Sequence, residues 1–342
     1  MKLARAVLSV GDSIAWGQGL LESDKYVSLT LSHLSQKYPN AKFNSIVSAH
    51  SGAPIGFGKA DVGSGADAEV PIDSPTIFSQ VVNASSGIAA GSDVRLVLLN
   101  GGINDIGVNT LIDPRLMEAD LRAKTELYCY SHMGELISAC LQKFDQASIV
   151  ITGYYQIISQ WSDPALVAFF GSSVGLLLGA IPGAIVLGAL SATAQTILSN
   201  NCLLFAQLAN NAFIRVAADT NTRLVASGDM RRVSVALPDY GPQNAVFAPQ
   251  SYLWSVNVVI DPLNPVVPTD SVITRRVMAC HAARQAGLIE DYTRCKFASI
   301  GHPNVTGAVA FAASIQLAIQ QLVVETNWDP QSCSWLPCVE IY

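Results

Sequence analysis

The sequence has few charged residues and lacks the motifs typical of metal, nucleic-acid and repeat proteins. Only 13% of its 342 residues are charged, and 50% are apolar, which excludes a disordered polyelectrolyte. The net charge is −6 and Lys and Arg form no run, so no nucleic-acid partner is expected. The sequence has no internal repeat, CxxC pair or HExxH motif. No metal site and no metal or organic cofactor is therefore expected.

Cysteine is also scarce. Seven cysteines are an odd number, too few for a disulfide scaffold but compatible with two or three bridges in a secreted enzyme. Cys280–Cys295 and Cys333–Cys338 are close enough in sequence to pair, although free thiols stay an alternative. The apolar run Ala6–Val10 is too short for a signal-peptide core. Localisation stays open, with a secreted protein whose signal was removed favoured slightly over a cytoplasmic one.

Short apolar runs alternate with helical patterns along most of the chain. Five segments are short, mostly apolar and followed by turn residues, as buried strands are: residues 6–10, 43–47, 94–99, 148–151 and 233–237. Helical spacing of apolar residues occurs over 23–38, 115–144 and 303–323. This alternation predicts a three-layer α/β/α fold with a central parallel sheet of about five strands. Ligands of such sheets bind at the carboxyl ends of the strands.

Residues 164–214 interrupt this alternation. They contain no Asp, Glu, Lys, Arg or His, and they follow the fourth predicted strand, beside the strand ends. We expect an apolar, helical insertion that covers the site as a lid. Two alternatives stay open: plain core helices, and contact with a membrane or lipid interface, since Leu166–Leu190 is long enough to cross a bilayer. The domain is predicted to span residues 1–325, with a C-terminal tail at 326–342.

Three polar blocks lie next to predicted strands or helices. Gly11-Asp12-Ser13 follows the first strand, Gly102-Ile103-Asn104-Asp105 follows the third, and His302-Pro303-Asn304 precedes the last helix. A serine needs a base to become a nucleophile, and histidine is the usual one. A neutral amide such as that of Asn104, together with backbone N–H groups, suits the stabilisation of an oxyanion.

The blocks resemble those of the SGNH (GDSL-type) hydrolase superfamily, in the family's order and over residues 11–307. The matching segments are Gly11-Asp12-Ser13-Ile14, Ser51-Gly52-Ala53, Gly102-x-Asn104-Asp105 and His302-Pro303-Asn304-x-x-Gly307. The resemblance implies a flavodoxin-like α/β/α fold and the hydrolysis of esters.

The resemblance also implies roles for single residues. Ser13 would be the nucleophile and His302 the general base. The donors of the oxyanion hole would be the backbone N–H groups of Ser13 and Gly52 and the side chain of Asn104. By the same analogy, two carboxylates would hold their loops and transfer no proton: Asp12 and Asp105. A histidine base of ordinary pKa would make activity rise with pH around 6–7.

One position departs from the family pattern. The family usually has an aspartate three residues before the histidine, and this position is Ser299 here. The Ser299 hydroxyl or a backbone carbonyl could accept the imidazole N–H, but neither stabilises imidazolium as a carboxylate does. We therefore expect a Ser–His dyad or an acid from elsewhere, with three candidates left open: Asp261, Asp270 and Asp291.

Two further motifs compete with this interpretation. Gly171-Ser172-Ser173-Val174-Gly175 matches the G-x-S-x-G nucleophile elbow, although it lies in a segment whose apolar character favours a helix. His50 lies next to the second block and could line the site.

The sequence thus predicts a serine esterase or lipase that forms an acyl-enzyme on Ser13. Its substrate would be a small-molecule or lipid ester, with a preference for hydrophobic acyl chains because of the apolar insertion. The alternative is a catalytically weak or inactive protein of the same fold that binds lipid or a partner.

Overall fold

Five parallel strands form the central sheet. The computed structural model describes residues 5–56, 58, 63–87, 93–173, 185–186, 189–190, 192–258 and 266–326. In spatial order the strands are β2 (Phe43–Val47), β1 (Arg5–Val10), β3 (Asp93–Leu99), β4 (Ser148–Thr152) and β7 (Val233–Ala236). Each strand agrees with its predicted run to within one residue, so the predicted parallel sheet is confirmed.

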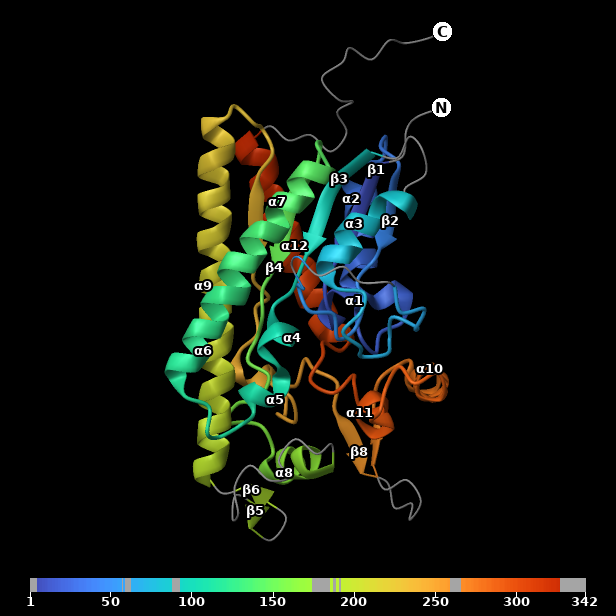
Figure 1. Ribbon diagram of the computed structural model, residues 1–342, viewed down its shortest axis with the longest axis vertical. Helices are drawn as coiled ribbons and strands as arrows, with labels where there is room; N and C mark the ends of the chain where they lie inside the picture. The colour runs from blue at the N-terminus through green and yellow to red at the C-terminus, as the bar shows by residue number, and fades with distance from the viewer. Residues whose placement is uncertain are drawn as a thin grey trace.

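Helices cover both faces of this sheet (Figure 1). The helices α2 (Tyr26–Lys37) and α12 (Val305–Thr326) pack together on one face, while α3 (Ile77–Gly87) and α7 (Met133–Lys143) lie on the other. Strands β1, β3 and β4 are buried between these layers, and most of their residues are aliphatic. The predicted three-layer α/β/α fold is confirmed.

The helical stretch predicted over 115–144 is interrupted by wider turns. It consists of α6 (Glu118–Thr125), a π-helical segment η2 (Glu126–His132) and α7. Cys129 in this segment is fully buried, and its Sγ lies 2.8 Å from where a Cβ on Gly102 would be. Gly102 has φ 119°, so both its backbone conformation and this contact require glycine.

The apolar insertion lies beyond the carboxyl ends of the strands (Figure 1). It contains α8 (Pro164–Ser173), the short antiparallel pair β5 (Ile185–Val186) and β6 (Ala189–Leu190), and the first part of α9 (Ala192–Ala226). No single helix spans Leu166–Leu190, because α8 ends at Ser173 and two strand segments follow. The predicted end of the insertion at residue 214 falls inside α9, which also packs against β7 and α7.

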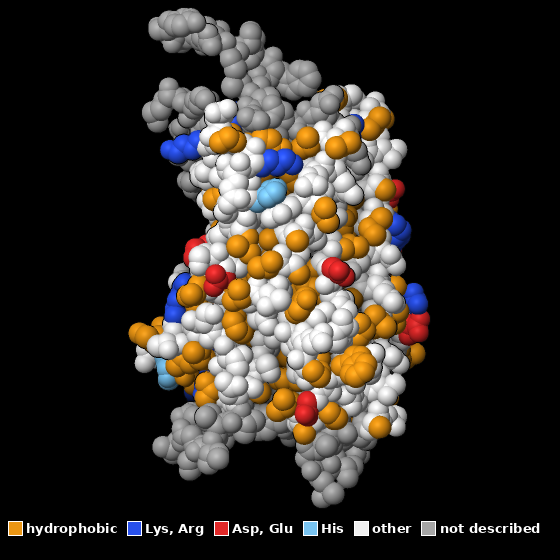
Figure 2. Space-filling view, turned by 180° about the vertical axis from the view of Figure 1, so that it is seen from behind, with side chains coloured by type: hydrophobic (Ala, Val, Ile, Leu, Met, Phe, Trp, Pro, Cys, Tyr) orange, Lys and Arg blue, Asp and Glu red, His pale blue; other side chains and the backbone are white. Residues whose placement is uncertain are grey.

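The last helix is the most apolar long helix in the described part of the chain. There, one stretch is long and apolar enough to cross a membrane, Val305–Val324 of α12, and 44% of it is buried. Its buried side packs against β4, β7 and α2, while Val309, Leu317 and Val324 are exposed. Figure 2, the view from behind, shows apolar side chains scattered among few charged ones. The packing against the sheet explains the apolar composition of α12 as that of a core helix.

Short elements fill the space beyond the strand ends. These elements are α1 (Ser13–Trp16), η1 (Glu22–Asp24), α4 (Ile103–Ile106), α5 (Val108–Leu111), η3 (Pro242–Asn244), β8 (Val256–Val258), β9 (Val266–Pro268), α10 (Ile273–Gln285) and α11 (Tyr292–Lys296). Two of them carry residues of the polar blocks: α1 begins at Ser13, and α4 contains Asn104.

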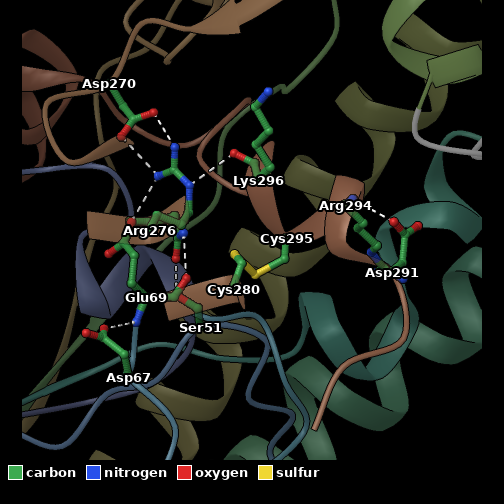
Figure 3. Close-up of a disulfide and its surroundings, with 11 residues drawn as sticks. Ser51, Asp67, Glu69, Asp270, Arg276, Cys280, Asp291, Arg294, Cys295 and Lys296 are labelled. Carbon is green, nitrogen blue, oxygen red and sulfur yellow. Dashed lines mark hydrogen bonds and ion pairs between the residues drawn. A yellow bond between two sulfur atoms is a disulfide. The ribbon is translucent and has the colours of Figure 1, made fainter. Parts of the chain in front are cut away.

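A disulfide joins two of these elements (Figure 3). Cys280 of α10 bonds to Cys295 of α11, with the two Cα atoms 5.9 Å apart. One of the two predicted pairs is therefore present, whereas Cys333 and Cys338 lie outside the described residues. Of the tail predicted at 326–342, only Thr326 is described, as the last residue of α12. Three further cysteines are free and buried: Cys129, Cys140 and Cys202.

Removing this disulfide should destabilise the fold. The bond closes a loop with a sequence separation of 15 residues, for which chain entropy predicts a loss of about 3 kcal/mol in the free energy of unfolding. Urea unfolding of Cys280→Ala/Cys295→Ala, compared with the wild type, measures this. A reductant should lower the midpoint of the wild type and leave that of the double variant unchanged; equal midpoints without reductant would contradict the prediction.

Candidate active site

Ser13 is held at the carboxyl end of β1 by a turn that only glycine can make. Gly11 has φ 153°, and a Cβ there would lie 2.6 Å from the Cβ of Ala15 and 2.9 Å from the carbonyl oxygen of Asn100. Asp12 then starts α1 by accepting the N–H of Ile14 at 2.8 Å. Ser13 is thus the first residue of a short helix that begins directly at the end of a strand.

His302 is brought to Ser13 by the loop that precedes α12. Its backbone N–H donates to the carbonyl of Ser299 at 2.9 Å, and its own carbonyl accepts from the N–H of Trp254 at 2.7 Å. His302 Nε2 lies 2.7 Å from Ser13 Oγ. A neutral ring with its proton on Nδ1 accepts the hydroxyl proton of Ser13 at this distance, which is the geometry that a general base needs.

The ring of His302 strongly prefers to be uncharged. Burial lowers the pKa of His302 to about 4, against the opposing effect of nearby carbonyl groups, that of Ser299 first, and the positive charge of Arg276 lowers it further. Within the described residues, His302 Nδ1 is buried and has no hydrogen-bond partner. At neutral pH the ring is therefore unprotonated and able to accept a proton.

The structure shows where the candidate partners of His302 lie. The Ser299 hydroxyl donates to Asp270 Oδ2 at 2.9 Å, and within the described residues it makes no hydrogen bond to His302 Nδ1. Among the carbonyl groups near the ring, that of Ser299 has the largest effect on the pKa of His302. Asp291 caps α11 by accepting the N–H of Arg294. In the described part of the chain neither Asp270 nor Asp291 hydrogen-bonds to His302, and Asp261 lies outside that part.

Two of the three expected oxyanion donors, Gly52 and Asn104, belong to segments that are tied together. Asp105 accepts the N–H of Ile55 at 2.9 Å, and Asn104 Nδ2 donates to the carbonyl of Ala53 at 3.1 Å. The amide of Asn104 has a second N–H. Gly52 has φ 81°, and a Cβ there would lie 2.6 Å from the backbone nitrogen of Ile72. Four residues line one cavity together: Ser13, Gly52, Asn104 and His302.

Two tyrosines after β4 support this arrangement, and the sequence analysis did not identify them. The Tyr154 hydroxyl donates to Asp12 Oδ2 at 2.9 Å and accepts the N–H of Ile103 at 3.0 Å, joining the first and third blocks. The Tyr155 hydroxyl donates to the carbonyl of Gly301 at 2.9 Å. Burial raises the pKa of Asp12 to about 6. Tyr154 and Tyr155 directly follow a parallel strand, and this position is the signal in the sequence that could have identified them.

Two other sequence candidates lie elsewhere. His50 is buried with Nδ1 2.9 Å from the carbonyl oxygen of Ser51, and the residues that line the cavity do not include it. Ser173 is the last residue of α8. A nucleophile elbow needs its serine between a strand and a helix, so the Ser173 interpretation is wrong.

The cavity at the site is large and mainly apolar. Its volume is about 1250 Å³. Val167 of α8 and Leu198 of α9 line it, so residues of the predicted insertion form part of its wall. Further apolar side chains come from the turns after β3, β4 and β7: Ile103, Ile112, Ile157, Ile158, Val246 and Phe247.

The chain is similar to several solved structures. No protein-family model and no curated protein sequence matches it. An extracellular lipase from Streptomyces rimosus is 14% identical, with 93% of this chain and 100% of the lipase covered and a TM-score of 0.48. The phospholipase A1 from Streptomyces albidoflavus NA297 is 15% identical (93% and 100% covered, TM-score 0.44). A carbohydrate esterase family 2 enzyme from Corynascus thermopiles is 14% identical (95% and 67% covered, TM-score 0.43). All three are distant likenesses.

The low proton affinity of His302 is directly measurable. We expect an NMR titration of the imidazole resonances to give a pKa of about 4 for His302, because the partly buried ring is poorly hydrated when it becomes charged. Comparison with His302→Gln assigns the resonance. A pKa at about 6.5, the value of a solvated histidine, would contradict the burial of the ring.

Proposed function

We propose that this protein is a serine esterase that hydrolyses carboxylic esters through an acyl-enzyme. The observation that carries the proposal is the 2.7 Å contact between Ser13 Oγ and His302 Nε2. Gly52 and Asn104 line the same cavity, so an ester carbonyl that reaches Ser13 also reaches donors for its oxygen. Both parts of acyl-transfer chemistry, an activated hydroxyl and an oxyanion site, are thereby together.

The proposed reaction has two stages. In the first, His302 takes the proton of Ser13 while Oγ attacks the ester carbonyl carbon, and the negative oxygen is stabilised by the N–H groups of Ser13 and Gly52 and by Asn104. The tetrahedral intermediate collapses as His302 protonates the leaving alcohol. In the second stage His302 deprotonates water, which attacks the acyl-enzyme, and Ser13 regains its proton as the acid leaves.

The base of this dyad works without a carboxylate on its second nitrogen. Nearby carbonyl groups, that of Ser299 first, favour the charged ring, but less than an aspartate would. The consequence is a base that stays neutral down to about pH 4. Activity should therefore persist well below the range of 6–7 that an ordinary histidine predicts.

We further propose that the apolar part of the cavity receives the acyl chain. Val167 and Leu198 are almost fully buried yet line the cavity, so they present hydrocarbon to whatever occupies it. The volume of about 1250 Å³ exceeds the usual upper range of about 1,000 Å³ for small-molecule sites. A lipid ester with a long chain fits this cavity better than an acetate ester does.

The remaining proposals concern location. The disulfide between α10 and α11 favours an oxidising compartment, and it supports secretion over a cytoplasmic location. The insertion, which contributes α8 and part of the cavity wall, is the segment that we propose contacts a lipid interface.

Removal of the nucleophile or of one oxyanion donor tests the mechanism. Ser13→Ala should abolish turnover of a chromogenic acyl ester. Asn104→Ala should lower kcat by roughly 10²–10³-fold, because it removes a donor that acts mainly in the transition state. An unchanged kcat would exclude Asn104 from the oxyanion hole.

The same assay distinguishes the alternative function. If neither the wild type nor Ser13→Ala turns over esters of any chain length, while a fluorescent fatty acid binds both equally, the protein is a lipid-binding member of this fold and the esterase proposal is wrong.

Narrowing the cavity should change the chain-length preference. Val167→Phe places a ring in the cavity wall and should lower kcat/KM for a C12 ester much more than for an acetate ester, because only the long chain needs that space. Val225→Phe makes the same change at an exposed position of α9 and should leave the ratio unchanged. Equal loss on both esters in Val167→Phe would refute the acyl-chain assignment.

A further inference from the structure

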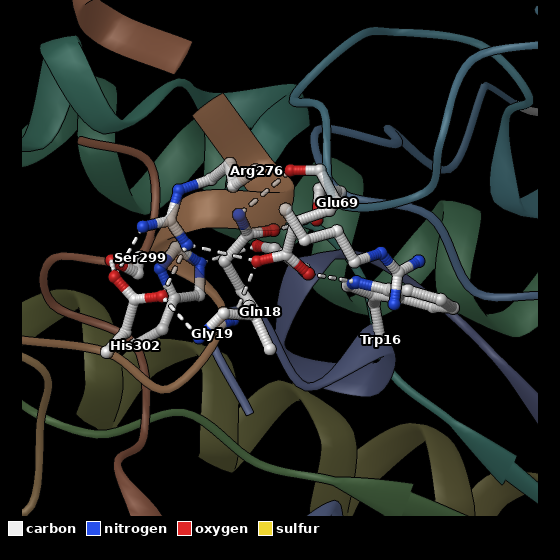
Figure 4. A network of polar contacts seen from close by, with 12 residues as sticks. Trp16, Gln18, Gly19, Glu69, Arg276, Ser299 and His302 are labelled. Carbon is white, nitrogen blue, oxygen red and sulfur yellow. Dashed lines mark hydrogen bonds and ion pairs between the residues drawn. The ribbon is translucent and has the colours of Figure 1, made fainter. Parts of the chain in front are cut away.

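A fully buried arginine lies near His302 in a network of polar contacts (Figure 4). Arg276 of α10 is 0% exposed. Its guanidinium donates to both oxygens of Asp270, one of them at 3.0 Å, and to Glu69 Oε1 at 3.1 Å. Its Nε donates to the carbonyl of Lys296 at 3.2 Å. All three nitrogens of the guanidinium are therefore engaged, in the forked geometry that lysine lacks.

On one side this arginine reaches the segment that follows the nucleophile. Glu69 accepts from Trp16 Nε1 at 2.6 Å and from the N–H of Gly19 at 2.8 Å. Both residues belong to the turn that ends the helix beginning at Ser13. Glu69 is buried, and burial raises its pKa, whereas its hydrogen bonds and the positive charge of Arg276 beside it act in the opposite direction.

The same side also reaches the loop of the oxyanion hole. Gln18 Nε2 donates to the backbone carbonyl of Glu69 at 2.9 Å, and the hydroxyl of Ser51 donates to the side-chain oxygen of Gln18. Ser51 directly precedes Gly52, one of the proposed oxyanion donors. The turn after Ser13 and the loop before Gly52 are thus fixed to one carboxylate residue.

On the other side the arginine reaches the general base. Asp270, also buried, accepts the Ser299 hydroxyl at 2.9 Å, and the Ser299 carbonyl accepts the backbone N–H of His302 at 2.9 Å. Lys296, whose carbonyl accepts from Arg276, is the last residue of α11, and the segment that follows it leads to Ser299 and His302. The position at which the family carries its aspartate is thus connected to an aspartate through one hydroxyl.

Buried charges of this kind are a poor means of gaining stability. The free energy needed to remove three charged groups from water offsets much of the free energy gained from their attraction. Proteins with well-packed apolar side chains in their place are often as stable. Their directional hydrogen bonds do supply something that apolar packing lacks, which is a fixed relative placement of separate loops. Catalysis depends on such placement, since small displacements of reacting groups lower rates steeply.

We propose that Arg276 is a positioning residue for the Ser13–His302 pair, holding the His302 loop through Asp270 and Ser299 and the Ser13 and Gly52 loops through Glu69. The inference rests on the proposed function of Ser13 and His302. It assigns to Asp270 the task of orienting the backbone of Ser299, and not that of contacting the imidazole.

Two conservative variants test the proposal. Ser299→Ala removes only the hydroxyl that connects Asp270 to the His302 loop, and Arg276→Lys keeps the positive charge but cannot bind Asp270, Glu69 and the Lys296 carbonyl together. Each should lower kcat for a chromogenic ester by roughly 10- to 100-fold with KM within about twofold. Each should also raise the NMR pKa of His302 from about 4 toward 6.5, because a looser ring becomes better hydrated.

A matched control separates positioning from general stability. Ser148 is 0% exposed, and its hydroxyl accepts the N–H of Arg232 at 3.3 Å at the start of β4, the end of the strand away from the site. Ser148→Ala should leave kcat and the pKa of His302 unchanged, whatever it does to the unfolding midpoint. If Ser299→Ala resembles Ser148→Ala in both readouts, the proposal is overturned, even where Arg276→Lys fails to fold.

The two readouts also separate this inference from the function on which it rests. A wild type without turnover, in which Ser299→Ala still moves the pKa of His302 and Ser148→Ala does not, would refute the esterase and retain the positioning role. If the wild type is active, and kcat and the pKa of His302 are unchanged in Ser299→Ala, the esterase proposal is retained and the positioning role is refuted.

Discussion

The contact between a serine hydroxyl and an imidazole nitrogen 289 residues away depends on one topological constraint. Parallel strands all end at the same edge of a sheet, so the turn after β1 and the loop before α12 meet although the chain between them forms most of the molecule. Gly11 makes this possible at atomic scale because no larger residue fits between Ala15 and Asn100. Every other part of the site is arranged around that meeting point.

The sequence contained enough information for the sheet and for the positions of the polar blocks. The central strands are short, mostly apolar segments bounded by turn residues, and they are recognisable because strands covered on both faces do not alternate in polarity. Ser13, Gly52, Asn104 and His302 were recognisable because they belong to compact blocks, each next to a strand or helix. Local pattern and tertiary placement agree at these residues.

What the sequence could not provide were the contacts made between distant segments. Glu69, Asp270 and Arg276 show no pattern, since their relation exists only after α10 packs against the loop before residue 70. Ser299 appeared as a substitute for an aspartate, and its hydroxyl is bound to Asp270 only in the folded protein. Tyr154 and Tyr155 were missed because a tyrosine after a strand also suits plain core packing.

The wall formed by α8 and α9 has a consequence for how this fold can diversify. The sheet holds the reacting groups, whereas Val167 and Leu198 come from a segment that joins β4 to β7 without itself supplying a strand to that sheet. Substitutions in this segment can therefore reshape the room available to a bound molecule while the reacting atoms keep their places. Selectivity and chemistry are encoded in separate stretches of the polypeptide, and natural variation in one need not disturb the other.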